Sequence, residues 1–192
     1  MYFFKQISSE ADKLNSYFNE TAKYTAKIIL TSFLSLMAAV FQSAGGFLPG
    51  IGFTVSPITT APIIISVIIS YQLGFMSYII TIFLLLIIQP SELFIYPFST
   101  GLLGLGIGIG FRLLKKRISI IILASFTLFI GILAVLYIVK FPILGPVSTN
   151  VNTYTLLLIY LFTIIYSWAW VEASLIMFKK LNKILYRGKN FK

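Results

Sequence analysis

Long apolar stretches, separated by short polar or glycine- and proline-containing segments, make up most of this sequence. The apolar runs cover residues 28–42, 57–89, 93–111, 118–139 and 153–178. A helix that crosses a bilayer needs about 20 predominantly apolar residues. The pattern therefore predicts an all-α, polytopic integral membrane protein with a transmembrane domain at 28–178.

The run at 57–89 is too long for a single span. As one helix it would measure about 50 Å at 1.5 Å per residue, whereas the hydrocarbon core of a bilayer is about 30 Å thick. The apolar pattern weakens at residues 71–74, Tyr-Gln-Leu-Gly. We therefore predict two short spans joined by a tight turn, which gives six transmembrane helices in all.

The positions of the basic residues favour the same division. Every Lys and Arg except Lys140 lies before 28–42, directly after 93–111 or after 153–178. Six spans place all of these on one side of the membrane, and the positive-inside rule makes that side cytoplasmic. A single span at 57–89 would separate the basic cluster at 112–117 from the N-terminal lysines. We expect cytoplasmic termini and a location in the cell membrane, as in a bacterial plasma membrane.

Two polar segments flank the apolar region. Residues 1–27 carry one apolar stripe at helical spacing, formed by Ile7, Ala11, Leu14, Phe18 and Ala22. The stripe predicts an amphipathic helix, either lying on the cytoplasmic leaflet or docking on a partner. Residues 179–192 form a basic cytoplasmic tail.

The segment 43–57 is apolar but rich in helix breakers. It reads SAGGFLPGIGFTVSP, with four Gly and two Pro. That composition disfavours a continuous helix, and irregular backbone at membrane depth must be buried in protein or line a cavity. We predict a loop folded over part of the protein, or a short re-entrant piece.

Composition and charge exclude several classes of function. Hydrophobic residues make up 58% of the chain and charged residues 10%, with a net charge of +10. The positive-inside bias accounts for that excess, so we expect no nucleic-acid partner. The chain has no Cys and no His, which removes thiolate chemistry and the commonest metal ligand and general base. We expect no catalytic residues, no metal and no cofactor.

Five glycines are concentrated in the run 93–111, at Gly101, Gly104, Gly106, Gly108 and Gly110. Their spacing superficially resembles a phosphate-binding turn, but such a turn needs a preceding strand in a soluble βαβ unit. Pairs four residues apart instead favour close helix packing. The sequence contains no GxxxxGK[ST] motif, so P-loop ATP hydrolysis by this chain is not expected.

A second set of small residues, Ser35, Ala39 and Ser43, follows one face of the first predicted span. Such a flat face serves either packing within the chain or docking of a partner membrane helix. The apolar region contains two acids, Glu92 beside a predicted outer loop and Glu172 within the last span. We expect Glu172 either to pair with a base from a neighbouring helix or to bind a partner.

The predicted topology gathers polar and aromatic residues at the outer ends of the spans. Glu92 either faces water as an ordinary loop residue or anchors a pocket open to the outside. A small-molecule site needs mostly apolar walls and a few convergent polar groups, and these loops supply that mixture. The candidate substrate-binding residues are Phe47, Phe53, Glu92, Tyr96, Lys140, Asn150, Asn152 and Tyr154.

These features together resemble the substrate-binding S components of energy-coupling factor (ECF) vitamin transporters. That family has six helices, cytoplasmic termini and a first outer loop that folds over the substrate, here Gly45 to Pro57. Its first helix carries a small-xxx-small face that contacts a membrane coupling subunit, here Ser35, Ala39 and Ser43. The family often has Ala-xxx-Ala there, and this chain has Ser at two of the three positions.

The resemblance implies a mechanism and a set of partners. The protein would capture a vitamin or related small nutrient from outside. A membrane coupling subunit and two cytoplasmic ATPase subunits would then drive its release inside. Glu92 with nearby aromatic residues suits a cationic ligand, and Lys140 equally suits a carboxylate.

Two other functions compete with this interpretation. One is a non-transporting membrane scaffold in cell-envelope or sporulation assembly, in which the outer polar residues are ordinary loop residues. The other is a stand-alone secondary transporter. The absence of ionisable residues from predicted spans 1, 2, 3 and 5, and of an evident internal duplication, disfavours the latter.

Overall fold

A computed structural model describes residues 2–48, 50–140 and 153–189, without the side chains of Phe53, Gly188 and Lys189. Helices account for nearly all of this part of the chain, and no strand forms within it. The elements are α1 (Ser9–Thr21), α2 (Tyr24–Phe47), α3 (Gly52–Val55), η1 (Ser56–Thr59), α4 (Thr60–Ile69), α5 (Tyr71–Ile88), η2 (Pro90–Phe94), η3 (Tyr96–Phe98), α6 (Thr100–Leu113), α7 (Arg117–Ala134), the π-helical turn η4 (Val135–Val139) and α8 (Thr153–Lys189).

Five of the described helical segments are long and apolar enough to cross a membrane. They are Tyr24–Phe47, Tyr71–Ile88, Pro90–Leu113, Arg117–Val139 and Thr153–Arg187. A sixth apolar segment, Ser56–Ile69, is shorter. The polytopic, all-helical class predicted from the hydrophobic pattern is therefore confirmed.

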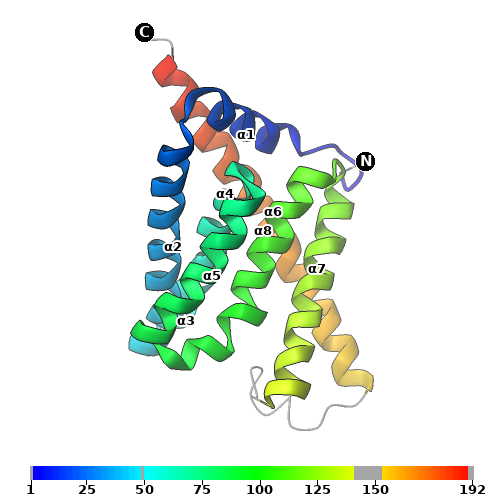
Figure 1. Ribbon diagram of the computed structural model, residues 1–192. Coiled ribbons are helices and arrows are strands. Elements are labelled where there is room, and N and C mark those ends of the chain that lie inside the picture. The colour runs from blue at the N-terminus through cyan, green and yellow to red at the C-terminus, as the bar shows by residue number, and fades with distance from the viewer. Residues whose placement is uncertain (1, 49, 141–152, 190–192) are drawn as a thin grey trace.

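The long helices run up and down in one bundle (Figure 1). The N-terminus, the C-terminal end of α8, the α4–α5 break and the α6–α7 turn lie at one end of the bundle, here named the terminal end. The turns η2 and η3 and the end of η4 lie at the opposite end, named the loop end. The basic residues that flank these helices therefore gather at the terminal end, except Lys140, which follows η4 at the loop end.

The run 57–89 is divided into two helices, as predicted, at Ser70. Ser70 has an extended backbone (φ −161°, ψ 141°), with α4 ending before it and α5 beginning after it. Gly74 makes the hairpin tight, because a Cβ there would lie 2.6 Å from the Cα of Val67. The break falls one residue before the predicted four-residue turn.

Helix α4 is the centre of the bundle, which compensates for its short length. Eight of its residues are buried, and it packs against α2, α5, α6 and α1. Its last carbonyl groups need partners, as at any buried helix end. Asn15 Nδ2 donates to the Ile68 carbonyl at 2.7 Å, and Arg112 Nη1 donates to the Val67 carbonyl at 3.3 Å.

Four of the five glycines of α6 alternate between two neighbouring helices, and Gly101 faces Tyr96 of η3, which confirms the packing interpretation. Gly104 and Gly108 lie against α4, where added Cβ atoms would approach Ile63 and Val67 to within 3 Å. Gly106 and Gly110 face Thr127 and Ile120 of α7. Small residues let the backbones approach closely, and this approach is a main source of packing energy between membrane helices.

The prediction of an irregular backbone for 43–57 is wrong over its first part. Helix α2 continues through Gly45 and Gly46 to Phe47, and α3 with η1 follows. The two glycines lie where α2 crosses the η2 region. A Cβ on Gly46 would collide with the Gln89 side chain, and one on Gly45 would lie 3.1 Å from Glu92 Oε1. Here glycine provides clearance for neighbouring side chains and does not end the helix.

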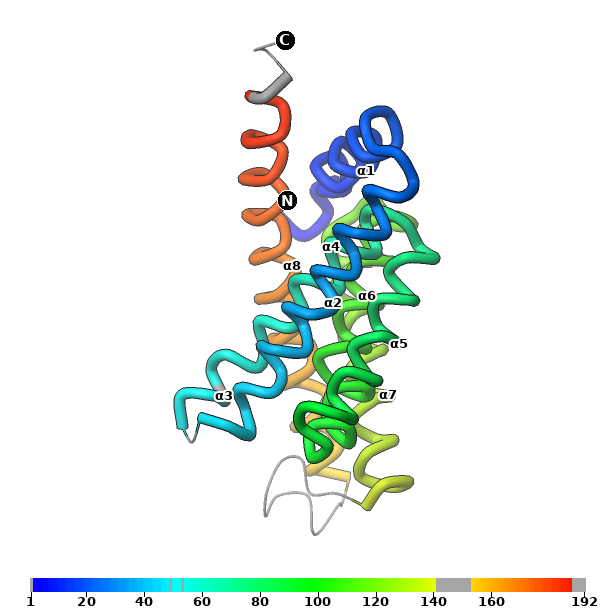
Figure 2. Tube along the Cα trace, turned by 60° about the vertical axis from the view of Figure 1, so that its left-hand side comes forward, coloured from blue at the N-terminus to red at the C-terminus, as the bar shows by residue number. Residues whose placement is uncertain are grey.

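The predicted N-terminal amphipathic helix forms as α1, but its apolar stripe faces the bundle. Ile7, Ala11 and Leu14 are buried in a cluster that includes Phe178 of α8 and Phe111 of α6. Contact with the chain's own helices therefore takes the place of the two predicted contacts, with the leaflet or with a partner. It forms because α8 extends beyond the bundle and offers α1 an apolar surface. Figure 2 shows α1 crossing beside the upper part of α8.

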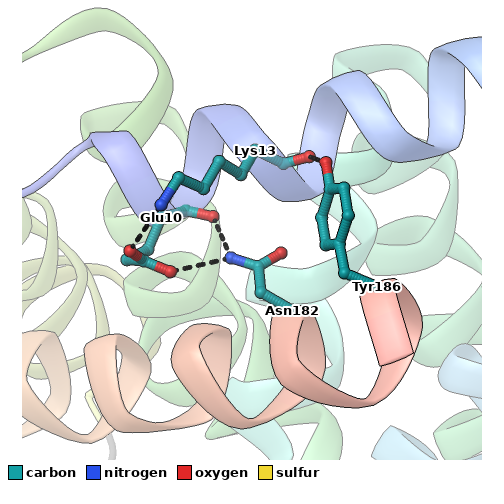
Figure 3. A network of polar contacts seen from close by, with 4 residues as sticks. All are labelled: Glu10, Lys13, Asn182 and Tyr186. Carbon is teal, nitrogen blue, oxygen red and sulfur yellow. Dashed lines mark hydrogen bonds and ion pairs between the residues drawn. The ribbon is translucent and has the colours of Figure 1, made fainter. Parts of the chain in front are cut away.

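Polar contacts join the same two helices (Figure 3). Asn182 Nδ2 donates to both the carbonyl oxygen and Oε2 of Glu10, each at 2.9 Å. Lys13 forms an ion pair with Glu10 Oε1 at 3.2 Å, and the Tyr186 hydroxyl donates to the Lys13 carbonyl. The hydrogen bond from Asn182 is the largest cause of a lowered pKa at Glu10. Glu10 is thus held in its ionised form at the α1–α8 contact.

Candidate functional site

A buried polar centre lies near the loop end of the bundle. Gln42 Nε2 donates to Glu92 Oε2 at 2.8 Å, and the Thr100 hydroxyl donates to Gln42 Oε1 at 2.7 Å. All three residues are buried, Gln42 completely. We name Gln42, Glu92 and Thr100 the outer polar centre.

Three different elements supply the outer polar centre. Gln42 lies on α2, Glu92 on the turn η2, and Thr100 begins α6. Pro90 fixes the start of η2, because its ring presets a helical φ angle and its missing N–H is not needed there. The chain reverses within this short segment and turns the Glu92 side chain inward, toward α2.

The Glu92 side chain has one neutral hydrogen-bond partner among the described residues, Gln42. Among the described residues, no Lys or Arg forms an ion pair with it, since the ion pairs found there are Lys13–Glu10 and Arg117–Glu172. Its Oε2 has the Gln42 amide, while Oε1 lies against Gly45 and accepts no hydrogen bond from the described residues. A carboxylate buried in this way is costly. Oε1 is therefore free to accept a hydrogen bond or a positive charge from a ligand.

Aromatic side chains continue the site from the outer polar centre into the bundle. Tyr96 is completely buried, and its ring lies 5.7 Å from that of Tyr78. The Tyr78 hydroxyl donates to the Pro97 carbonyl at 2.9 Å. The Tyr96 hydroxyl has no partner of standard geometry. This hydroxyl is therefore a buried polar atom without a standard hydrogen bond to the described residues.

The structure brings only some of the predicted substrate-binding residues together. Glu92 and Tyr96 lie in the interior on the successive turns η2 and η3. Phe47, Lys140 and Tyr154 are exposed, and Lys140 ends η4 with a left-handed backbone (φ 55°). The Phe53 side chain, Asn150 and Asn152 lie outside the described part of the protein.

Sequence reasoning missed Gln42 and Thr100. The hydrophobic pattern marks Gln42 only as the end of the first span, and it does not distinguish Thr100. A signal was present, because an amide inside an otherwise apolar helix must find a hydrogen-bond partner there. That partner could not be identified from the sequence, since Glu92 is distant along the chain and reaches Gln42 only through the η2 reversal.

The small-residue face of α2 lies inside the bundle. Ser35, Ala39 and Ser43 are all buried. The Ser35 hydroxyl donates to the Ser77 hydroxyl of α5 at 2.8 Å, and Thr81 of α5 donates to the Ser35 carbonyl. The face thus packs within the chain, the first of the two alternatives. A partner helix would have to displace α5 to reach it.

Glu172 pairs with a base from a neighbouring helix, the first alternative considered for it. Arg117, at the start of α7, places Nε 2.7 Å from Glu172 Oε1. The same guanidinium lies 3.8 Å from the centre of the Tyr2 ring and donates to the Tyr2 carbonyl. Arg117 thereby joins the N-terminal segment, α7 and α8 at the terminal end.

These features define a polytopic α-helical membrane protein with a buried acid–amide centre near one end. No family model matches the chain, and neither a curated protein nor a solved structure matches it.

Proposed function

We propose that this protein is the substrate-binding membrane subunit of an importer, similar to the S components of ECF transporters. It would capture a vitamin or related small nutrient from outside and pass it inward with a membrane coupling subunit and two partner ATPases. The proposal includes six spans, with the terminal end in the cytoplasm of a bacterial cell and the loop end outside.

The observation that carries the proposal is the outer polar centre. A buried carboxylate with a neutral partner and an unoccupied oxygen is costly in a membrane protein. Such a group is expected where it serves binding or transport. A scaffold protein would gain nothing from it, because an apolar pair of similar size would pack there at lower cost.

The topology of the proposal is supported by the fold. The shortest apolar segment, Ser56–Ile69, measures about 21 Å at 1.5 Å per residue. It need not match the bilayer by itself, because α4 is enclosed by other helices and its backbone end is satisfied by Asn15 and Arg112. Counting it as a span places the basic α6–α7 turn and both termini on one side.

Two measurements on the full chain test the proposal. The first is the melting temperature of the purified protein across a panel of vitamins and related nutrients. One ligand should raise it, since a ligand that binds the native state stabilises that state. Glu92→Gln should lose most of the rise, while Asp12→Asn, an exposed acid-to-amide change on α1, should keep it.

The second measurement is co-purification from the native host through an affinity tag. A membrane coupling subunit and two ATPases should be recovered in stoichiometric amounts. Recovery of no ATPase, together with no stabilisation by any nutrient in the panel, would refute the proposal. Recovery of cell-envelope or sporulation proteins instead would favour the scaffold function.

A further inference from the structure

A second polar cavity lies at the terminal end, away from the outer polar centre. It has a volume of about 290 Å³ and is bounded by α1, α2, the α4–α5 break and the end of α6. Among its lining residues are Asn15, Asn19, Lys27, Tyr71 and Arg112, and none of the lining residues is acidic. We name this space the inner cavity. Two cations without an acid give it a net positive charge.

Both cations keep hydrogen-bond donors for a ligand. Lys27 Nζ donates to the neutral oxygen Asn19 Oδ1 at 2.7 Å. The Arg112 guanidinium lies 3.8 Å from the centre of the Tyr71 ring, and Nη1 donates to the Val67 carbonyl. Neither cation forms an ion pair with an acid in the described part of the chain. Ammonium and guanidinium groups with free donors bind phosphate oxygens well.

The inner cavity is held in shape by its own hydrogen bonds. Asn15 Nδ2 donates to the Ile68 carbonyl, and Asn19 Nδ2 donates to Asn15 Oδ1 at 3.1 Å. Asn19 Oδ1 in turn accepts from Lys27. The side-chain amides of Asn15 and Asn19 thus link the end of α4 to the Lys27 ammonium and fix its position. A site whose cations are already positioned loses less conformational entropy when an anion binds.

The surface next to the inner cavity is apolar and exposed. Tyr24 and Ile28 on the first turns of α2, and Tyr71 and Phe75 on the first turns of α5, are exposed. Tyrosines at this position are typical of the bilayer interface, and Ile28 and Phe75 lie further toward the middle of the bundle. A ligand with a charged head and an apolar tail matches both surfaces at once.

We propose that the inner cavity binds the phosphate-bearing headgroup of an anionic phospholipid of the cytoplasmic leaflet. Lys27 and Arg112 contact the phosphate, and the acyl chains lie along Ile28 and Phe75. Basic pockets between membrane helices on the cytoplasmic side are suited to such headgroups. The choice of leaflet rests on the orientation in the proposed function. The binding site itself depends on the inner cavity and not on the nutrient function, so lipid binding and nutrient binding can fail separately.

The test measures lipid binding to the full chain in neutral detergent. Short-chain phosphatidylglycerol, short-chain phosphatidylcholine and inorganic phosphate are titrated separately, and binding is followed by native mass spectrometry and by the melting temperature. Phosphatidylglycerol should bind at least about tenfold more tightly than the other two. Lys27→Gln/Arg112→Gln should weaken it by at least about tenfold. Lys180→Gln/Lys183→Gln, an equal charge change at exposed positions of α8, should leave binding unchanged.

Each other result overturns the proposal. Equal binding of the two lipids would show that the site does not distinguish an anionic headgroup from a zwitterionic one. Competition by inorganic phosphate as strong as that by the lipid would show a soluble anion site. A loss of binding in the α8 variant would show a general effect of surface charge. Lys27→Gln alone serves if the double variant misfolds, because the Lys27 side chain bonds only to Asn19 among the described residues. This single change should still weaken binding severalfold.

Discussion

The two ends of the bundle carry polar sites of opposite design. In the outer polar centre, the amide of Gln42 on α2 donates to the buried acid and accepts a hydrogen bond from Thr100 of α6. The inner cavity is open and cationic, and its charges project from α2 and the end of α6. The first site is closed by the packing of the bundle, while the second lies at its edge. Loss of one hydrogen bond should lower the free energy of unfolding strongly at the buried site and weakly at the site on the edge of the bundle.

The largest effect is expected from Gln42→Leu. This change leaves Glu92 Oε2 and the Thr100 hydroxyl without their partner in a buried site. It should reduce the free energy of unfolding by about 3 kcal/mol, the sum expected for a charged and a neutral hydrogen bond. Denaturation in mixed micelles measures it.

A Gln-to-Leu change at a less buried position shows how much of the Gln42 effect is due to burial. Gln89→Leu removes a side-chain amide whose one hydrogen bond to the described residues goes to Ser91, and it should cost less than about 0.5 kcal/mol. The double variant Gln42→Leu/Glu92→Leu should recover part of the loss, since no buried charge then remains. Equal losses in the two single Gln variants would contradict the claim that burial makes the Gln42 hydrogen bonds costly to lose.

The hairpin that shapes the inner cavity supplies the next largest effect. Gly74→Ala places a Cβ against the Val67 backbone, which cannot move without disturbing α4. We expect a loss of about 2 kcal/mol. Gly110→Ala, whose Cβ would meet the Ile120 side chain at 3.1 Å, should lose less than half of that. Melting temperatures compare the two, and a larger loss in the Gly110 variant would contradict the packing of the hairpin.

A smaller loss is expected at the contact between α1 and α8. Asn182→Ala removes two hydrogen bonds to Glu10, and should cost about 1 kcal/mol. Hydrogen exchange should rise in α1 more than in α4. Uniformly increased exchange across both helices would show that α1 is not a separate, peripheral unit.

The smallest effect is a pH dependence of the same contact. The pKa of Glu10 lies below its ordinary value of 4.5, chiefly because Asn182 donates to it and secondarily because of Lys13. Its stabilising effect is therefore complete above that value and is lost as the pH falls through the lowered pKa. Glu10→Gln should reduce the pH dependence of the melting temperature below about pH 4.5. If the melting temperature of Glu10→Gln still falls with pH in this range as it does for the native sequence, other groups cause the acid destabilisation.

The sequence predicted the helical class, the division of 57–89 and the packing of the glycines in α6. These features depend on local composition, which the hydrophobic pattern records directly. It failed at Gly45 and Gly46, because the room they leave for Glu92 and Gln89 is visible only in three dimensions. The sequence likewise left the apolar stripe of α1 between the leaflet and a partner, since an apolar helix face does not specify what covers it.

The candidate site was predicted only in part for the same reason. Glu92 stood out as an acid in an apolar region, and Tyr96 as an adjacent aromatic residue. Gln42 and Thr100 reach Glu92 through contacts between distant segments, so no local pattern identifies them. Ser35, Ala39 and Ser43 fit two kinds of contact equally, and only the position of α5 distinguishes them.

The most direct test of the account is the side of the membrane on which each end lies. The chain contains no cysteine, so single cysteines can be introduced at Tyr154, Lys115 and Lys183 without a background signal. A membrane-impermeant maleimide applied to intact cells should label Tyr154→Cys, and should label Lys115→Cys and Lys183→Cys only after permeabilisation. Labelling of Tyr154→Cys and Lys183→Cys from the same side would contradict the six-span topology and the distinction between an outer and an inner site.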